Sequence, residues 1–140
     1  AEFEGSPAEK AEKIVDKYQQ QGRRIPGLGH PHHPVDPRSE KLLAMQRELG
    51  APRAHTDLML AIHKAACERR GKHLTFNAVA AVGAIASDIG IDWRAVRGIG
   101  LVARTIGLIG HVFEELNRPS AQAIWNLVEE NSDYSDPQGA

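Results

Sequence analysis

The chain has 140 residues, which is enough for one domain or part of one with a buried core. Hydrophobic residues make up 41% and charged residues 25%, as in an ordinary soluble globular protein. With 17 basic and 18 acidic residues the net charge is −1, so no uniform field draws the protein onto nucleic acid or an anionic membrane. No apolar run approaches the roughly 20 residues that a membrane-spanning helix needs, and we expect no membrane segment.

Two features of the composition bear on fold class and compartment. Aromatic residues are scarce, at 5%, and Ala, Leu, Ile and Gly carry the apolar content, which suits packed helices better than a β-sandwich. The single cysteine, Cys67, excludes an internal disulfide and favours a cytoplasmic location. Because the chain begins Ala-Glu-Phe without a methionine, we interpret it as a fragment of a larger polypeptide.

The first helix is predicted from a start signal and a periodic stripe. Residues 6–9, Ser-Pro-Ala-Glu, form a capping box with proline at the first helical position. Behind it the apolar residues Ala11, Ile14, Val15 and Tyr18 recur with helical spacing, and Gly22 is a plausible stop. Residues 23–37 contain four prolines within a dozen positions, which predicts an irregular loop.

Further helices are predicted along the rest of the chain. Their expected ranges are 38–49, 54–70, 76–89, 92–117 with Asp92 as the cap, and 119–130. The segment 76–89 is apolar nearly all round, and such a helix is normally buried. No strand pattern competes, so the sequence predicts an all-α fold of about six helices, followed by a loose tail over residues 132–140.

The loop Pro26-Gly27-Leu28-Gly29-His30 could carry chemistry. Glycines let backbone N–H groups approach a ligand closely, and a histidine there could exchange a proton near neutral pH. A tight surface turn explains the same residues. His30, His32 and His33 also raise the question of a metal site, but no thiolate or spaced second cluster completes a ligand set, and His55, His63 and His73 show no recognised spacing. We therefore expect no metal.

Two arginines stand in unusual positions. Arg38 is expected in the first turn of a helix, where a cation opposes the helix dipole, so it is either exposed or paired with an acidic partner. Arg104 lies in an apolar stretch and shares one helix face with Arg97 and His111. A structural ion pair and anion binding both remain open for Arg104. Glycines at three positions of that helix predict a close approach by another helix or a ligand: Gly100, Gly107 and Gly110.

Four motifs in order resemble the citrate synthase and citryl-CoA lyase family. The loop at residues 26–30, followed by Asp36-Pro37-Arg38, is similar to the family's P-G-x-G-H and D-P-R. The segment from Asn77 to Gly90 falls in register with the helix that opens N-V-D. Residues 103–111, Ala-Arg-Thr-Ile-Gly-Leu-Ile-Gly-His, resemble A-R-x-x-G-x-x-x-H, and Arg118-Pro119 lies where the family has R-P-R.

The resemblance implies an all-α, homodimeric enzyme two or three times as long as this chain. Its active site would lie between a large and a small domain and bind coenzyme A, as acyl-CoA, with a di- or tricarboxylate. Residues 1–100 would form the small domain, and residues 101–131 would be helices that pack on or belong to the large domain. The implied reaction makes or breaks a C–C bond between an acyl-CoA and a 2-oxo acid, and the stretch 108–115 looks nearer to the citryl-CoA lyase branch.

The resemblance also implies roles for individual residues. His30 matches the catalytic histidine that holds the carbonyl of the oxo acid. Arg38 and Arg104 match carboxylate-binding arginines, and Arg118 matches the arginine given to the neighbouring subunit. The backbone of Gly27, Leu28 and Gly29 would lie along coenzyme A.

Two departures from the family pattern stand out. The H-G-G histidine of the family falls ahead of the first residue of this chain. The catalytic aspartate position holds Val79, which cannot exchange a proton. An alternative is therefore a non-catalytic regulator that binds coenzyme A or a carboxylate, or an inactive partner subunit. A plain helical interaction module is disfavoured by the ordered set of motifs.

Overall fold

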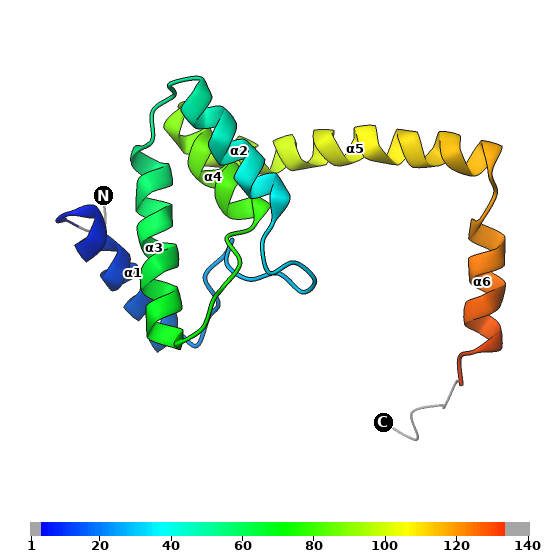
Figure 1. The fold of residues 1–140 in the computed structure, drawn as a ribbon, viewed down its shortest axis with the longest axis horizontal. Coiled ribbons are helices and arrows are strands. Elements are labelled where there is room, and N and C mark those ends of the chain that lie inside the picture. Colours follow the sequence, from blue (N-terminus) through cyan, green and yellow to red (C-terminus); the bar gives the residue numbers. More distant parts are fainter. Residues whose placement is uncertain (1–3, 134–140) are drawn as a thin grey trace. The chain divides into compact units, whose positions relative to one another are not determined.

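The computed structural model describes residues 4–133 and contains six helices. They are α1 (Pro7–Gln20), α2 (Pro37–Glu48), α3 (Ala54–Arg70), α4 (Ala78–Asp88), α5 (Trp93–Asn117) and α6 (Ala121–Glu130) (Figure 1). Over the described residues the only extended pairing is an isolated antiparallel bridge between Leu28 and Phe76. The predicted all-α fold is confirmed. The chain divides into two compact units, residues 1–97 and 98–140, which we describe separately.

The core of the first unit lies between α1 and α3. The predicted capping box is present: the Ser6 hydroxyl accepts the Glu9 N–H at 3.3 Å, and the Glu9 carboxylate accepts the Ser6 N–H at 2.8 Å. The helix thus begins where the sequence predicts and turns its apolar stripe onto α3. The core cluster consists of Ala11, Val15, Ile62, Ala65 and Ala66. Burying a side chain as large as Ile62 stabilises the fold by about 1.5–3 kcal/mol.

Asp88 at the end of α4 connects three helices. The residue before α3, Arg53, provides no side-chain cap. The Asp88 carboxylate, fully buried, takes that place by accepting the N–H groups of His55 at 2.7 Å and Thr56 at 3.0 Å. It also accepts the Thr56 hydroxyl at 2.7 Å and the Gln46 amide of α2 at 3.0 Å. The start of α3 is therefore capped from α4, over thirty residues away in sequence.

The fourth helix is only partly buried, which corrects the expectation that it is enclosed on all sides. Ala80, Ala81, Ala84 and Ala86 are buried, but Val79 in the first turn is 67% exposed. The helix starts at Ala78 rather than Phe76 because Phe76 is held in the bridge to Leu28.

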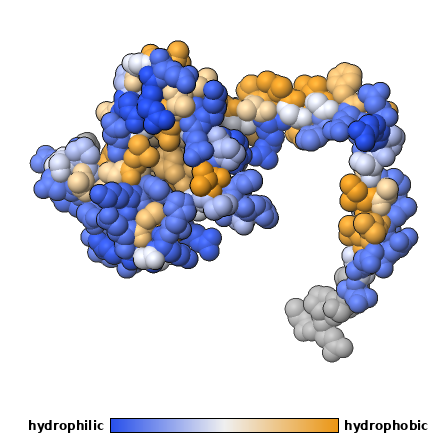
Figure 2. All heavy atoms as spheres, in the orientation of Figure 1, coloured by the Kyte–Doolittle hydropathy of each residue, from blue (hydrophilic) through white to orange (hydrophobic). Residues whose placement is uncertain are grey.

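The second unit exposes its apolar side chains. Among its described residues, 98–133, none is buried. Exposed apolar residues form a stripe on α5 and another on α6, visible as hydrophobic colour along both helices (Figure 2): Ile99, Val102, Ile106, Ile109 and Phe113, then Ile124, Trp125, Leu127 and Val128. The expected close approach to Gly100, Gly107 and Gly110 is not made by any described residue, since nothing lies within 4 Å of a Cβ built there.

Helix α5 also corrects the expectation of no membrane-length apolar segment. Its 25 residues are long and apolar enough, by length and composition alone, to cross a membrane. A core helix of a soluble protein passes the same test. The charged stripe of Arg97, Arg104 and His111, on the side opposite the apolar stripe, is typical of an amphipathic helix covered by protein on one face.

The C-terminal helix begins two residues later than predicted. Both carboxylate oxygens of Glu115 accept the Ser120 N–H, at 2.9 and 3.0 Å, and one of them accepts the Ala121 N–H at 2.9 Å. This capping from the end of α5 fixes the start of α6 at Ala121. Most of the tail expected to be loose, residues 134–140, lies outside the described residues.

We predict that Asp88→Asn lowers the free energy of unfolding by roughly 2–4 kcal/mol, as expected when one or two charge-assisted hydrogen bonds to a buried carboxylate are lost. Urea titration followed by circular dichroism measures the change. Asp57→Asn is the matched control, since this exposed carboxylate pairs with Arg53 at 3.0 Å and its loss should cost less than about 1 kcal/mol.

The same carboxylate makes stability depend on pH. Burial raises the pKa of Asp88, but hydrogen bonds from Thr56, His55 and Gln46 together outweigh it and lower the pKa from 3.8 to about 2. Because the folded-state pKa is depressed, this stabilisation, roughly 2 kcal/mol, is complete above pH ~4 and is lost as the pH falls through about 2. A stability difference between wild type and Asp88→Asn that stays constant over that window would contradict this role.

Candidate functional site

The glycine loop is held by main-chain hydrogen bonds to the segment that enters α4. The Gly29 N–H donates to the Thr75 carbonyl at 2.7 Å, and the Asn77 N–H donates to the Gly27 carbonyl at 3.0 Å. The Asn77 side chain adds a third contact, from its amide nitrogen to the Gly29 carbonyl at 2.8 Å. Its amide oxygen caps α4 by accepting the Val79 N–H at 2.9 Å. Asn77 therefore fixes the loop against the first turn of α4.

Gly27 is required by both conformation and space. Its φ is +88°, in the left-handed region that favours glycine. A Cβ at this position would lie 2.7 Å from the Ala80 Cβ and 2.9 Å from the Ala80 backbone nitrogen. The loop backbone thus packs directly on the backbone of α4. Gly29 also has a positive φ, +94°, but nothing lies within 4 Å of a Cβ there.

His30 is fixed in one tautomer by the loop that follows it. Its Nδ1 accepts the backbone N–H of His32 at 3.1 Å and of His33 at 3.0 Å. A nitrogen that accepts two hydrogen bonds carries a lone pair, so the proton of the neutral ring is on Nε2. His30 is thus arranged to donate a hydrogen bond from Nε2.

The surroundings of His30 also favour the neutral ring. Partial burial is the largest effect that lowers the pKa of His30 below its ordinary value. Positive charge on His33, Arg38 and His32 lowers the pKa further, against the opposing effect of Asp36. The ring of His33 lies 4.6 Å from that of His30 between centroids. These effects keep a neutral hydrogen-bond donor in place at physiological pH.

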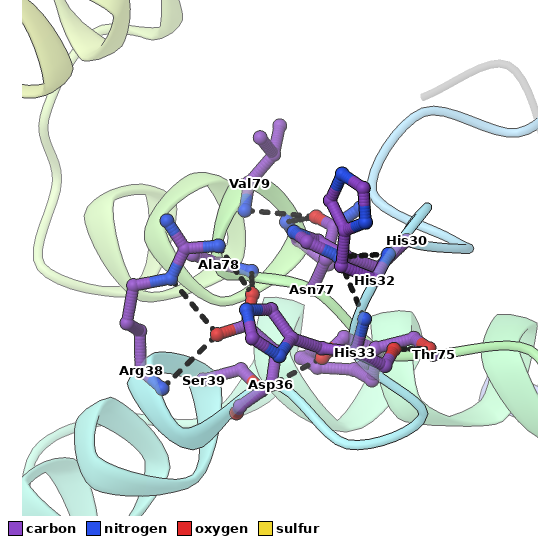
Figure 3. A network of polar contacts seen from close by, with 12 residues as sticks. His30, His32, His33, Asp36, Arg38, Ser39, Thr75, Asn77, Ala78 and Val79 are labelled. Atoms are coloured by element: carbon purple, nitrogen blue, oxygen red, sulfur yellow. Dashed lines mark hydrogen bonds and ion pairs between the residues drawn. The ribbon is translucent and has the colours of Figure 1, made fainter. Parts of the chain in front are cut away.

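Asp36 joins α2, α4 and Arg38 (Figure 3). Its carboxylate accepts Nε and Nη2 of Arg38 at 2.9 and 2.8 Å, and the Arg38 N–H at 3.1 Å. The same carboxylate accepts the N–H of Ala78, the first residue of α4, at 2.9 Å. The hydrogen bonds from Arg38 are the largest effect that holds the pKa of Asp36 well below its ordinary range. The partner that Arg38 was expected to need is therefore Asp36, although the Arg38 side chain remains 63% exposed.

The starts of α2 and α4 meet at the site, next to one residue without a titratable group, Val79. The N-termini of α2 and α4 meet at Asp36, and the N-terminal end of a helix carries partial positive charge. Val79 projects from the same first turn of α4 and is 67% exposed (Figure 3). His30, Arg38 and Val79 belong to one network that runs through Gly29, Asn77 and Asp36.

A cleft of about 710 Å³ opens beside the glycine loop in the first unit. Leu28, Gly29 and His30 line one part of it. The remaining lining is strongly basic and includes Arg23, Arg24, Arg69, Arg70 and Lys72, and none of the described lining residues is acidic. Arg69 is already paired with Glu12 at 2.8 Å and with Asp16, while Arg23 lies over the Tyr18 ring, 5.6 Å from its centroid. The cleft suits an anionic ligand with several charges.

Comparison with known proteins identifies the family. The sequence matches the family described as citrate synthase, C-terminal domain, over residues 2–125. The chain belongs to the citrate synthase family. A solved structure of citryl-CoA lyase from Hydrogenobacter thermophilus is similar to it, with a TM-score of 0.74 and 29% sequence identity over 93% of this chain and 51% of that one. None of the curated proteins compared with the chain matches it.

The family match confirms the resemblance on which the site residues were chosen, but their roles stay predictions. In the first unit of this citrate synthase family member, Gly27, Leu28, Gly29, His30 and Arg38 lie in one connected region. The chain spans about half the length of the citryl-CoA lyase. The resemblance assigns Arg104 to the same active site as His30 and Arg38, and this stays a prediction because Arg104 lies in the second unit.

The two remaining arginines lie on and after α5. Arg104 is exposed and forms no ion pair with the described residues 98–133, so the structural ion pair considered from sequence is not found within its own unit. Arg118 lies between α5 and α6, where its N–H donates to the Glu114 carbonyl at 2.7 Å. Both side chains thus remain candidates for anion binding.

Sequence reasoning missed two contributions to the site. Asp36 was noted only as part of a motif, although an acidic residue followed by proline is a helix N-terminal signal that could have marked it. The basic cleft was missed because its cations come from the loop after α1 and the end of α3, which are separated by more than forty residues. No pattern along the chain relates those positions.

We predict that His30 is neutral at pH 7, because partial burial and the nearby His33 lower its pKa below the ordinary value, and that its proton is on Nε2, because its Nδ1 accepts two backbone N–H groups. Nitrogen-15 NMR of the imidazole distinguishes the two nitrogens and follows their titration. The His32→Ala variant should keep the tautomer, since the N–H donor belongs to the backbone. A proton on Nδ1 at pH 7 would contradict this arrangement.

We predict that Gly27→Ala destabilises the protein much more than Gly29→Ala. Both residues have positive φ, so each alanine meets the strain of the left-handed region, about 1–2 kcal/mol. Only at residue 27 does the new methyl group also collide with α4. Thermal and urea unfolding of the two variants measure the difference, and equal destabilisation would show that the loop does not pack on Ala80 as described.

Proposed function

We propose that this chain is the small-domain part of an enzyme that makes or breaks a C–C bond between an acyl-CoA and a 2-oxo acid. The citryl-CoA lyase direction is our first choice, because the similar solved structure is that of a citryl-CoA lyase. The observation that carries the proposal is the neutral, oriented His30 beside a basic cleft. That combination suits a carbonyl next to the anionic groups of coenzyme A.

His30 is proposed to bind the oxygen that changes between hydroxyl and carbonyl. When the C–C bond of a 3-hydroxyacyl-CoA with a carboxylate on the same carbon breaks, the hydroxyl loses a proton and becomes the carbonyl of the 2-oxo acid. The bonding electrons pass to the acyl-CoA α-carbon, which forms an enolate and takes up a proton. A hydrogen bond from His30 Nε2 stabilises the negative charge that develops on the hydroxyl oxygen.

Carboxylate groups of the substrate would be held by positive charge around Arg38. Two of its guanidinium nitrogens already bind Asp36, which leaves the outer edge of the fork exposed for a second carboxylate. Arg104 is proposed as a further carboxylate ligand and Arg118 as an arginine given to a neighbouring subunit. A charge-assisted hydrogen bond of this kind contributes about 1.5–3 kcal/mol.

Coenzyme A is proposed to lie along Gly27, Leu28 and Gly29 with its phosphates toward the basic cleft. The cleft is large enough, at about 710 Å³, for part of such a ligand. Arg24, Arg70 and Lys72 supply positive charge in its lining without an ion pair to described residues. The loop backbone packs closely on α4 at Gly27, which fixes the position of the loop along which the ligand would lie.

Proton transfer at the acyl-CoA α-carbon is the step that this chain does not supply at the expected position. Val79 occupies the position of the catalytic aspartate, and its side chain has no titratable group. If the unmodified protein turns over at ordinary enzyme rates, another group is the base, and His32, His33 or a group outside this chain would take that role. A homodimer and the rest of the large domain complete the proposed assembly, which would also cover the apolar stripes of α5 and α6.

The second candidate is a non-catalytic protein that binds coenzyme A or a carboxylate, as a regulator or as an inactive partner subunit. The exposed Val79 in the first turn of α4 specifically favours it. In that case ligand binding through His30, Arg38 and the basic cleft would remain while turnover is absent. Binding and turnover therefore separate the two candidates.

We predict that Val79→Asp raises turnover of citryl-CoA cleavage, or of acyl-CoA condensation with a 2-oxo acid, in the full-length protein. General base catalysis is typically worth about a hundredfold to ten-thousandfold. The exposure of Val79 means that the substitution does not bury a charge in the core. Release of free coenzyme A or formation of the thioester gives the rate.

Val79→Asn is the matched control, since it has the same shape as aspartate but is no base. An equal rise with Asn and Asp would show that polarity rather than proton transfer limits the reaction. Ordinary enzyme rates in the unmodified protein would show that another group already acts as the base. Binding of coenzyme A without turnover in either variant would favour the non-catalytic candidate, and absence of both would refute the proposal.

A further inference from the structure

A second cluster of potential ligands lies on α3 and the loop that follows it. His63 and Cys67 are one helical turn apart on the same face of α3, and His73 comes from the loop. One ligand atom from each residue lies within 4.8 Å of the others. The spacing of these residues in the sequence does not match a known metal-binding motif. They come together because the chain turns at Gly71 after α3 and brings His73 back beside the helix.

The hydrogen bonds of the cluster already orient two ligands. His73 Nε2 lies 2.9 Å from the Pro34 carbonyl, so it carries the proton and leaves the lone pair on Nδ1. A metal-binding histidine commonly donates its other N–H to a carbonyl in this way. The Leu74 N–H points to Cys67 Sγ at 3.3 Å, a contact that stabilises a thiolate.

The distance between the two helical ligands fits a tetrahedral ion. Cys67 Sγ and His63 Nε2 are 3.4 Å apart. Bond lengths of about 2.3 Å to sulfur and 2.0–2.1 Å to nitrogen place these atoms about 3.6 Å apart around Zn²⁺. His63 Nε2 now donates to the Leu74 carbonyl at 2.6 Å, so a metal bound to this nitrogen would replace the proton and displace the Leu74 carbonyl oxygen. His73 needs only a small inward movement, and it lies in an exposed loop.

We propose that His63, Cys67 and His73 form a binding site for Zn²⁺, with the fourth position open to water. One thiolate and two imidazoles form a ligand set suited to zinc, and three protein ligands with an open position are compatible with its tetrahedral geometry.

The site would stabilise the segment that holds the glycine loop. Leu74 and Thr75 directly follow His73, and the Thr75 carbonyl accepts the Gly29 N–H. A metal that ties His73 to α3 restrains this segment at its start. Because an ion that binds only the folded state stabilises it, the melting temperature should rise with Zn²⁺ concentration.

Cobalt(II) is the probe for the test, because it replaces zinc and absorbs light. The metal-free, reduced protein without an affinity tag is titrated with Co²⁺. We expect saturation at one equivalent, with a near-ultraviolet thiolate-to-cobalt charge-transfer band and intense visible bands of tetrahedral cobalt, both removed by Zn²⁺. Cys67 is the only cysteine of the 140 residues, and Cys67→Ser assigns the band whatever thiols a longer polypeptide contains.

Variants separate this site from other histidines. Cys67→Ser should abolish the charge-transfer band, and His73→Ala, in an exposed loop, should weaken Co²⁺ binding at least tenfold. The double variant His32→Ala with His33→Ala keeps the backbone donors to His30 and should leave the band unchanged. Circular dichroism confirms that each variant is folded. Absence of the band, a band that survives Cys67→Ser, or unchanged affinity after His73→Ala would overturn the proposal.

Discussion

The buried carboxylate of Asp36 is the constraint on which the geometry of the candidate site depends. The residue is 1% exposed, and an unpaired charge at such a position would be strongly unfavourable. It is compensated by the Arg38 guanidinium and by N–H groups at the starts of α2 and α4. If either helix moved, some of these hydrogen bonds to Asp36 would be lost. The geometry of the site is therefore fixed by the hydrogen bonds and the ion pair of Asp36 rather than by a large apolar core.

Asp88 acts in the same way at the opposite end of α4. It caps α3 and receives the Gln46 amide of α2, so α4 is tied to its neighbours at both ends by buried carboxylates. No buried side-chain nitrogen or oxygen among the described residues lacks a hydrogen-bond partner. Small alanines fill the space between these anchors, which allows the helices to pack closely. This close packing is what requires glycine at residue 27.

The chemistry that this arrangement supports is the stabilisation of negative charge. His30 is held as a neutral donor, the N-termini of two helices converge, and a basic cleft lies alongside. The exposed Val79 has no titratable group, at the position where the family resemblance implies a carboxylate. The apolar stripe of α5 faces no described residue of its unit, in keeping with a chain that spans about half of its structural relative.

The sequence by itself determined the helices and the family. Helix boundaries follow from local rules, such as the Ser6 capping box, the Asp92 cap and the prolines of residues 23–37, because hydrogen bonds within a few residues decide them. The ordered motifs indicated the glycine loop, His30 and Arg38 as candidate site residues. Local prediction erred by two residues at the start of α4, where Asn77 is the N-cap and Phe76 pairs with Leu28, and at the start of α6, which Glu115 caps.

Only the tertiary structure decided how distant side chains are used. The capping of α3 by Asp88, the bond from Asp36 to the first turn of α4 and the approach of His73 to Cys67 each join segments that local patterns do not relate. The tautomer of His30 likewise depends on the path of the backbone through residues 30–33. The physical reason is the same in each case: a buried or oriented polar group is defined by its partners, and folding alone brings those partners together.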